Sequence, residues 1–159
     1  GMPVGAYGGK REIMDYVSPQ GPVYQAGTLS GNPVAMAAGL TMLSQINEGE
    51  GPYQQLENTT LALKEGFQKN LNDLSLPYTM NQVGSMISLF FTSEKVTDFE
   101  GAKSSDTVLF GRYFREMLNQ GIYLAPSQYE SLFISTAITS ELVDKIVAAN
   151  RAALEAIHA

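Results

Sequence analysis

The sequence predicts an α+β fold, in which an antiparallel sheet is covered by helices. Apolar residues make up 44% of the 159 residues, which is enough for a real core. Several segments have the apolar spacing of amphipathic helices, and short runs typical of β-strands lie between them. Strand pairs with helices packed on one face are the expected architecture for this order of elements.

The first fifty residues differ from the remainder in their glycine and proline content. Residues 1–33 are rich in glycine and proline, which indicates loops and close backbone approaches. Asn32 and Pro33 then predict the start of a helix over residues 34–48, because asparagine caps helices and proline at the first helical position loses no needed N–H. We expect this helix to end at Gly49 and Gly51.

A second, longer helix is predicted to begin at Pro52 and to end before Pro77. Its apolar residues recur at helical spacing and form one continuous stripe. The polar positions between them are expected to face solvent. The stripe consists of Leu56, Leu63, Phe67, Leu71 and Leu74.

Two strands are predicted next, over residues 78–82 and 85–92, separated by Gly84. The run over residues 86–91 is apolar at nearly every position, so we expect this strand to be covered on both faces. A loop that carries Asp98 and Glu100 should follow.

The last third of the chain predicts a helix over residues 104–119, with Gly121 at its C′ position. Short strands are expected over residues 122–124 and 132–134. A final helix is predicted over residues 140–157, with Thr139 or Ser140 as its cap. Residues 1–50 do not obviously belong to the core that these elements build.

Composition excludes several classes of function. The net charge of −6 argues against a nucleic-acid module, which would carry a basic patch. The chain has no cysteine, which excludes disulfides and thiolate metal sites, and its one histidine, His158, makes a Ser-His-Asp triad improbable. No apolar stretch approaches the ~20 residues that span a bilayer. We therefore expect a cytoplasmic protein, and the charged fraction of only 16% suggests that part of its surface is covered.

The sharpest local feature is the run Gly-Thr-Leu-Ser-Gly-Asn-Pro over residues 27–33. Glycines and hydroxyls stand directly before a predicted helix start, where free N–H groups and a partial positive charge favour a phosphate or carboxylate. The alternative is an ordinary capped helix preceded by a glycine turn. Tyr24 also stands out, because it lies four residues before Thr28.

A second candidate is the loop Ala-Pro-Ser-Gln-Tyr-Glu over residues 125–130. Glu130 has apolar neighbours, so its carboxylate could be a buried acid-base group. The alternative is a solvated loop glutamate. The run over residues 5–9, Gly-Ala-Tyr-Gly-Gly, is a weaker signal that could be a simple turn.

Three stretches together resemble one enzyme family. Residues 3–9 (Pro-Val-Gly-Ala-Tyr-Gly-Gly), 24–33 and 124–130 are similar to the glutamate-1-semialdehyde 2,1-aminomutases. These are pyridoxal-phosphate (PLP) enzymes of fold type I in the class III aminotransferase group. The first two stretches resemble the wider group, and the third points to the aminomutases. The resemblance runs from Pro3 to about Ile157.

The resemblance implies roles for particular residues. Gly27 and Thr28 would bind the phosphate of the partner subunit's PLP across a homodimer interface, and Tyr24 would lie at that interface. Glu130 would lie in the active site near a small-molecule substrate as a polar or acid-base group. Residues 1–50 would be the end of the large PLP-binding domain, and residues 51–159 the small C-terminal α+β domain.

One family feature has no counterpart in this sequence. The lysine that bonds covalently to PLP precedes the motif that here occupies residues 3–9, and no lysine of this chain matches it. A lysine of this kind is central to PLP chemistry, so we expect this chain by itself to be inactive. Two alternatives stay open: part of another class III aminotransferase, and a stand-alone, non-catalytic binding or dimerisation module.

Overall fold

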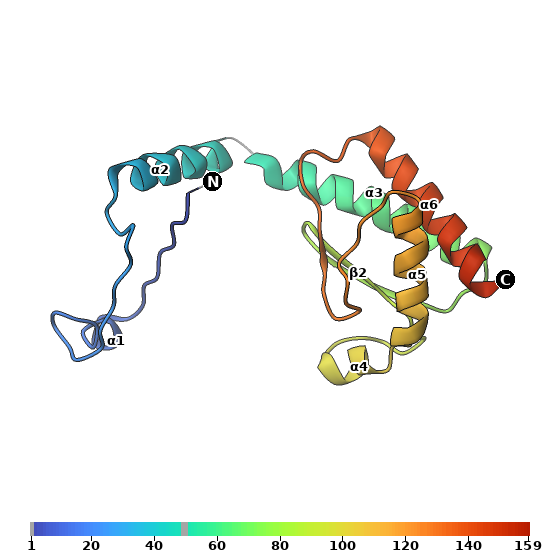
Figure 1. The fold of residues 1–159 in the computed structure, drawn as a ribbon, viewed down its shortest axis with the longest axis horizontal. Coiled ribbons are helices and arrows are strands. Elements are labelled where there is room, and N and C mark those ends of the chain that lie inside the picture. Colours follow the sequence, from blue (N-terminus) through green and yellow to red (C-terminus); the bar gives the residue numbers. More distant parts are fainter. Residues whose placement is uncertain (1, 49–50) are drawn as a thin grey trace. The chain divides into compact units, whose positions relative to one another are not determined.

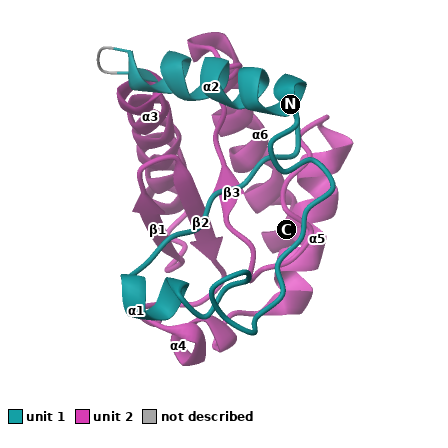
Figure 2. Cartoon of the chain, turned by 90° about the vertical axis from the view of Figure 1, so that its left-hand side faces the viewer, with its two compact units in different colours: residues 1–51 teal, residues 52–159 magenta. Residues whose placement is uncertain are grey.

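The computed structural model describes residues 2–48 and 51–159, which divide into two compact units after Gly51 (Figures 1 and 2). The division lies close to the point where the amino-acid composition of the sequence changes. The assignment of the units to two domains of a larger enzyme stays a prediction.

The main element of the first unit is helix α2 (Pro33–Asn47). It begins where the sequence predicts, because the side-chain oxygen of Asn32 accepts hydrogen bonds from the N–H groups of Val34 and Ala35, at 3.0 and 3.1 Å. The prediction that Gly49 ends this helix lies outside the described residues.

A short helix, α1 (Arg11–Met14), also lies in this unit and was not predicted. The surrounding sequence is rich in glycine and proline, so a single helical turn cannot be recognised there from the sequence alone. Gly51, the other predicted stop for α2, is the first residue of α3.

The second unit has the predicted α+β architecture, with fewer strands than expected. Its three-stranded sheet has the order β1-β2-β3, and both pairs are antiparallel. Its elements are α3 (Gly51–Asp73), β1 (Thr79–Val83), β2 (Met86–Phe90), α4 (Phe99–Lys103), α5 (Thr107–Asn119), β3 (Leu132–Phe133) and α6 (Ser140–His158).

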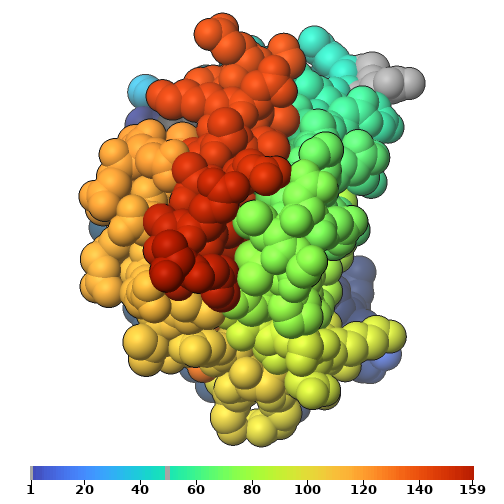
Figure 3. Space-filling model, turned by 90° about the vertical axis from the view of Figure 1, so that its right-hand side faces the viewer, coloured from blue at the N-terminus to red at the C-terminus, as the bar shows by residue number. Residues whose placement is uncertain are grey.

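Helices α3, α5 and α6 build the main core against the sheet. The core joins Leu71 of α3, Leu89 of β2, Met117 of α5 and Leu154 of α6, all buried. Figure 3 shows α6, in red, lying between α5, in orange, and the end of α3, in green. Burial of these apolar stripes is the main stabilising contribution to the unit.

Strand β2 is covered on both faces, as its apolar run predicts. Leu89 joins the core beneath the helices, whereas Phe90 packs on the other face against Val96 and Ala102. Gly84, with a φ of 52°, makes the turn that connects β1 to β2.

The prediction of a strand over residues 122–124 was wrong. The N–H of Ile122 donates to the carbonyl of Met117 at 2.9 Å, and Gly121, with a φ of 80°, donates to Leu118 at 2.9 Å. These two bonds are a Schellman motif that ends α5, as the prediction of a C′ glycine at this position implies. The segment beyond it has no regular secondary structure and pairs with no described strand.

The predicted loop around Asp98 instead forms α4. The carboxylate of Asp98 accepts a hydrogen bond from the N–H of Gly101 at 2.8 Å and so caps this short helix. Asp106 caps α5 in the same way, which is why α5 begins at Thr107 rather than at residue 104.

The polar positions of α3 do not all face solvent, contrary to prediction. Thr60 and Asn70 are buried. Asn70 donates to the side-chain oxygen of Asn150 at 2.9 Å, and Asn150 donates to the hydroxyl of Tyr113 at 2.8 Å. This network links α3, α6 and α5, and burial raises the pKa of Tyr113 far above its usual value.

The edge of β2 beyond β3 is completed by a side chain rather than by a strand. Gln128, which is buried, donates through Nε2 to the carbonyl of Leu89 at 2.9 Å. Its Oε1 accepts from the N–H of Phe91 at 3.2 Å. A primary amide presents the same donor and acceptor as a backbone residue, so Gln128 occupies the place of one residue of a neighbouring strand. It thereby fixes the loop over residues 125–130 to the sheet.

Replacing this amide tests the anchor. In Gln128→Leu the carbonyl of Leu89 and the N–H of Phe91 lose their partners while they stay buried, so we expect the free energy of unfolding to fall by about 2–4 kcal/mol. Urea denaturation of the chain measures this change. The control Gln68→Leu removes an exposed amide of α3, and we expect it to change stability by no more than about 0.5 kcal/mol. Equal losses in the two variants would contradict the anchoring role.

Candidate functional site

Two glycine-rich motifs lie around one hollow in the first unit. The hollow is lined by residues 3–7, by most of residues 25–31 and by Met36 of α2. The two stretches are separated by almost twenty residues of sequence, so their convergence is a property of the fold. Gly27 and Thr28, both candidate site residues, belong to this lining.

The loop over residues 27–31 offers several hydrogen-bond donors. The N–H of Ser30 donates to the carbonyl of Gly27 at 3.0 Å, which closes a tight turn. Among the described residues, the N–H groups of Thr28, Leu29 and Gly31 have no hydrogen-bond partner, and neither do the hydroxyls of Thr28 and Ser30. Thr28 is exposed. These donors suit an anion with several oxygens.

Backbone geometry explains one of the two glycines of the turn. Gly31 has a φ of 72°, a conformation that glycine adopts without strain. A Cβ at position 27 would lie 2.8 Å from the hydroxyl oxygen of Ser30, so a larger residue there would require that side chain to move.

The helix start contributes less to anion binding than the sequence suggests. Asn32 occupies the N–H groups of Val34 and Ala35, and Pro33 has no N–H to offer. The donors come from the loop before the helix, and the helix adds its partial positive charge.

The aromatic residues of the first unit are strongly exposed. Tyr24 is 83% exposed and does not line the hollow, so its place at an interface stays a prediction. Tyr7 is 61% exposed and does line it. Tyr7 is not among the residues predicted from the sequence, because a tyrosine beside glycines has no chemical signature of its own.

Glu130 belongs to the second unit, and its carboxylate is exposed rather than buried in the core. Its N–H donates to the carbonyl of Ser127 at 3.1 Å, within the loop that Gln128 anchors. Directly after it, the hydroxyl of Ser131 lies 3.0 Å from that of Ser88 in β2. Glu130 is thus a surface carboxylate held by fixed residues on both sides, and its chemical role stays a prediction.

No helix in the described parts of the chain is long and apolar enough to cross a bilayer.

Comparison with known sequences matches nearly the whole chain. The model of the family described as aminotransferase class-III matches residues 1–154. A glutamate-1-semialdehyde 2,1-aminomutase from Cytophaga hutchinsonii is 57% identical over 158 residues, which are 99% of this chain and 37% of that relative. The aminomutase from Persephonella marina is 57% identical over 145 residues, which are 91% of this chain and 34% of the relative. The chain thus spans little more than a third of the length of these curated relatives.

Solved structures share the fold at lower sequence identity. An omega-transaminase from Sphaerobacter thermophilus matches 96% of this chain and 35% of its own, with a TM-score of 0.80 and 24% identity. A glutamate-1-semialdehyde aminomutase from Pseudomonas aeruginosa matches 92% of this chain and 33% of its own, with a TM-score of 0.71 and 20% identity. With the family model matching 154 residues, the chain belongs to the class III aminotransferase family.

Proposed function

We propose that the chain is part of a PLP-dependent glutamate-1-semialdehyde 2,1-aminomutase. Such an enzyme converts (S)-4-amino-5-oxopentanoate into 5-aminolevulinate, a step of tetrapyrrole synthesis that we expect to occur in the cytoplasm. The observation that carries the proposal is the convergence of residues 3–7 and 25–31 on one hollow with unpartnered donors. The identity with the named aminomutases supports the choice of reaction.

The residues of the hollow fit the phosphate group of PLP. Thr28 and Ser30 offer hydroxyls, and the loop between them offers N–H groups, so several neutral donors can surround a dianion. PLP, when bound, supplies an aldehyde that holds an amino group and a ring that withdraws electrons. The contribution of Gly27 and Thr28 is to bind and orient the phosphate end.

We expect the phosphate to belong to the PLP of a partner subunit in a homodimer. Thr28 is exposed on its unit, and Tyr24 places a large aromatic surface in solvent four residues away. Exposed aromatic surface of this kind is enriched at protein interfaces. A dimer interface here would cover Tyr24 and bring Thr28 to the neighbouring site.

Glu130 would act on the substrate. The isomerisation moves an amino group from C4 to C5, so a proton must leave C4 and another must reach C5. A carboxylate at the surface of the second unit can accept a hydrogen bond from the substrate amine or hold a proton. The Gln128 anchor limits its motion, which favours orientation of the substrate.

A second candidate is an aminotransferase that uses an external amino donor. The omega-transaminase fold supports it, because solved structures of both activities share the architecture of this chain. The loop over residues 125–130 favours the aminomutase, since it is the stretch that resembles that family alone. The effect of replacing Glu130 on aminomutase turnover therefore distinguishes the aminomutase from the aminotransferase.

The phosphate role of Thr28 is tested in a full-length enzyme that carries this sequence. We expect Thr28→Val to raise the Kd for PLP about tenfold or more, because a hydroxyl bonded to a charged group contributes about 1.5–3 kcal/mol. Equilibrium dialysis measures it. Thr41→Val is the control, because its hydroxyl bonds only to the carbonyl of Ala37 within α2. An unchanged Kd in Thr28→Val would contradict the assignment.

The role of Glu130 predicts a loss of turnover without a loss of PLP. We expect Glu130→Gln to lower kcat about 100-fold, the usual contribution of a positioned acid-base group. The Kd for PLP should stay within about twofold, because Glu130 lies outside the hollow near Thr28. Glu57→Gln, on the exposed side of α3, serves as the control. Unchanged aminomutase turnover in Glu130→Gln would contradict an acid-base role for Glu130.

Hybrid dimers test whether Thr28 serves the partner's site. When Thr28→Val and Glu130→Gln subunits are mixed at a PLP concentration that leaves the Thr28→Val site largely empty, one site of each hybrid should be intact if Thr28 acts across the interface and Glu130 acts within its own subunit. Activity should then recover to about half of the normal value per hybrid dimer. If both residues serve the same subunit's site, every site carries one defect and no activity returns.

A further inference from the structure

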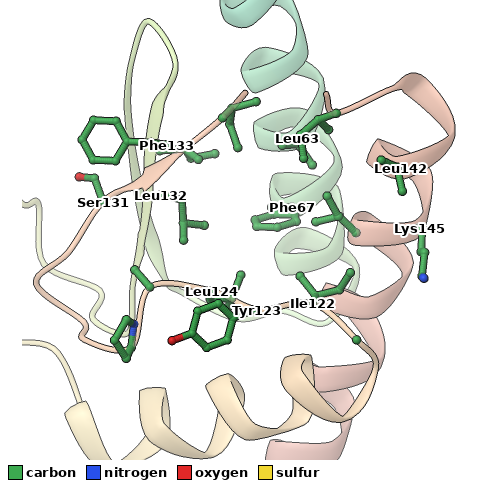
Figure 4. Close-up of a pocket in the computed structure, with 17 residues that line it drawn as sticks. Leu63, Phe67, Ile122, Tyr123, Leu124, Ser131, Leu132, Phe133, Leu142 and Lys145 are labelled. Atoms are coloured by element: carbon green, nitrogen blue, oxygen red, sulfur yellow. The ribbon is translucent and has the colours of Figure 1, made fainter. Parts of the chain in front are cut away.

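The second unit contains an apolar hollow beside β3, separate from the loop near Thr28. Its volume is about 490 Å³. Figure 4 shows Leu63 and Phe67 of α3 pointing into it, with Leu132 of β3 on one side and Leu124 on another. Among its described lining residues, Lys145 is the one charged group, and its side chain points away from the centre. The hollow is thus an apolar depression of the second unit, and its lining includes Leu63 and Phe67, which are both buried.

Strand β3 borders this hollow as a free edge of the sheet. The N–H of Ile134 donates to the carbonyl of Ser85 at 2.9 Å, and hydrogen-bonded pairs alternate along antiparallel strands. Phe133, opposite Met86, therefore directs its N–H and C=O away from β2. Neither group has a hydrogen-bond partner among the described residues, and the Phe133 side chain is 74% exposed.

The opposite wall of the hollow also has unpaired backbone. Residues 123–125 follow the Schellman motif of α5, have no regular secondary structure and line the hollow. Within the described chain, their N–H and C=O groups form no hydrogen bond. The sequence predicts a strand over residues 122–124, and the structure contains an irregular segment there whose backbone has no described partner to pair with.

Free edges of sheets are normally protected by charges, proline or a bulge. The sequence Leu-Phe-Ile over residues 132–134 has none of these features. The other edge of the sheet, β1, carries the polar residues Asn81 and Gln82. The β1 edge also has no charge or proline, but its polar residues suit it better to water than the apolar β3 edge.

We propose that a further β-strand, supplied by the part of the enzyme outside the region matched here, adds to the edge of β3 and fills this hollow. The relatives are almost three times as long as their match to this chain, so sequence for such a strand exists in them. The strand would be extended, with apolar residues at alternate positions. One face of it would enter the hollow, whose lining includes the buried Leu63 and Phe67, while its backbone would pair with Phe133.

A second copy of this chain fits the hollow less well. If β3 of one copy paired with β3 of another, its inward residue, Leu132, would already be packed in its own core. Both hollows would then stay unfilled. The proposal depends on family membership and not on the reaction assigned to the enzyme.

Hydrogen exchange tests the added strand directly. The probe is a full-length chimera, in which this chain replaces the matched region of the Cytophaga relative, compared with this chain alone. We expect the amide of Phe133 to exchange on the order of 100-fold more slowly in the chimera, because a paired amide exchanges only when the structure opens. The amide of Ile134 is already bonded to Ser85 and is the internal reference. Equal rates for Phe133 in the two proteins would overturn the proposal.

The dependence of exchange on protein concentration distinguishes an added strand of the same enzyme from a second copy of this chain. If slower exchange at Phe133 also appears in this chain alone and increases with its concentration, the occupant is a second copy and the proposed strand is wrong. Protection in the chimera alone supports the proposal even if the chimera is inactive, so failure of the proposed reaction is seen separately.

Proline substitution gives a second, independent test. Phe133→Pro removes an N–H that faces away from β2, so it spares β2–β3 pairing and blocks the added strand. Gln82→Pro is the matched control, since Gln82 lies opposite Ile87 on the outer edge of β1. We expect Phe133→Pro to lower the Tm of the chimera more than Gln82→Pro does, and to shift the chain alone no more than the control. Equal shifts in the chimera would contradict the added strand.

Discussion

Strand β2 is the element on which the second unit depends, and its hydrogen bonding is completed in an unusual way. One edge pairs with β1, but β3 covers only the beginning of the other edge. Gln128 supplies the remaining partners for Leu89 and Phe91. Because a buried backbone group without a partner costs about 1–3 kcal/mol, the loop that carries Gln128 cannot leave without destabilising the strand. The position of Glu130 follows from this constraint.

Elements set by local chemistry could be predicted from the sequence. Asn32, Thr139 and Gly121 mark the ends of helices because capping acts within a few residues. The stripe that includes Leu63, Phe67 and Leu71 is buried as its spacing predicts. Long-range effects escaped prediction: Asn70 is buried because Asn150, eighty residues away, accepts its hydrogen bond. The failed strand over residues 122–124 has the same cause, since a strand needs a partner that local sequence does not specify.

The residues of the candidate site can also be separated into those that local sequence predicts and those that depend on long-range contacts. Gly27 and Thr28 could be found as candidates because glycines and hydroxyls before a predicted helix start are a local signature of an anion site, and the resemblance to a family gave them a phosphate role. That residues 3–7 share their hollow could not be derived from spacing, because their convergence with residues 25–31 is a property of the fold. The sequence left open whether Glu130 is buried or is a solvated loop glutamate, and the structure shows it exposed, with Gln128 buried instead. A glutamine in a polar loop carries no sequence signal for such a role.

The apolar hollow beside β3 and the loop anchored by Gln128 are formed by the same short segment of chain. Residues 123–125 line the hollow, Gln128 bonds β2, and Leu132 begins the free strand, all within ten residues of chain. A strand that paired with Phe133 would restrain the loop from one side while Gln128 restrains it from the other. Glu130 lies between these two restraints, so an occupied hollow would narrow the range of positions open to its carboxylate. The charged fraction of 16% agrees with this view, because surfaces that are covered by further protein do not need charge to stay in solution. Orientation of Glu130 would then depend on packing that lies outside the site itself.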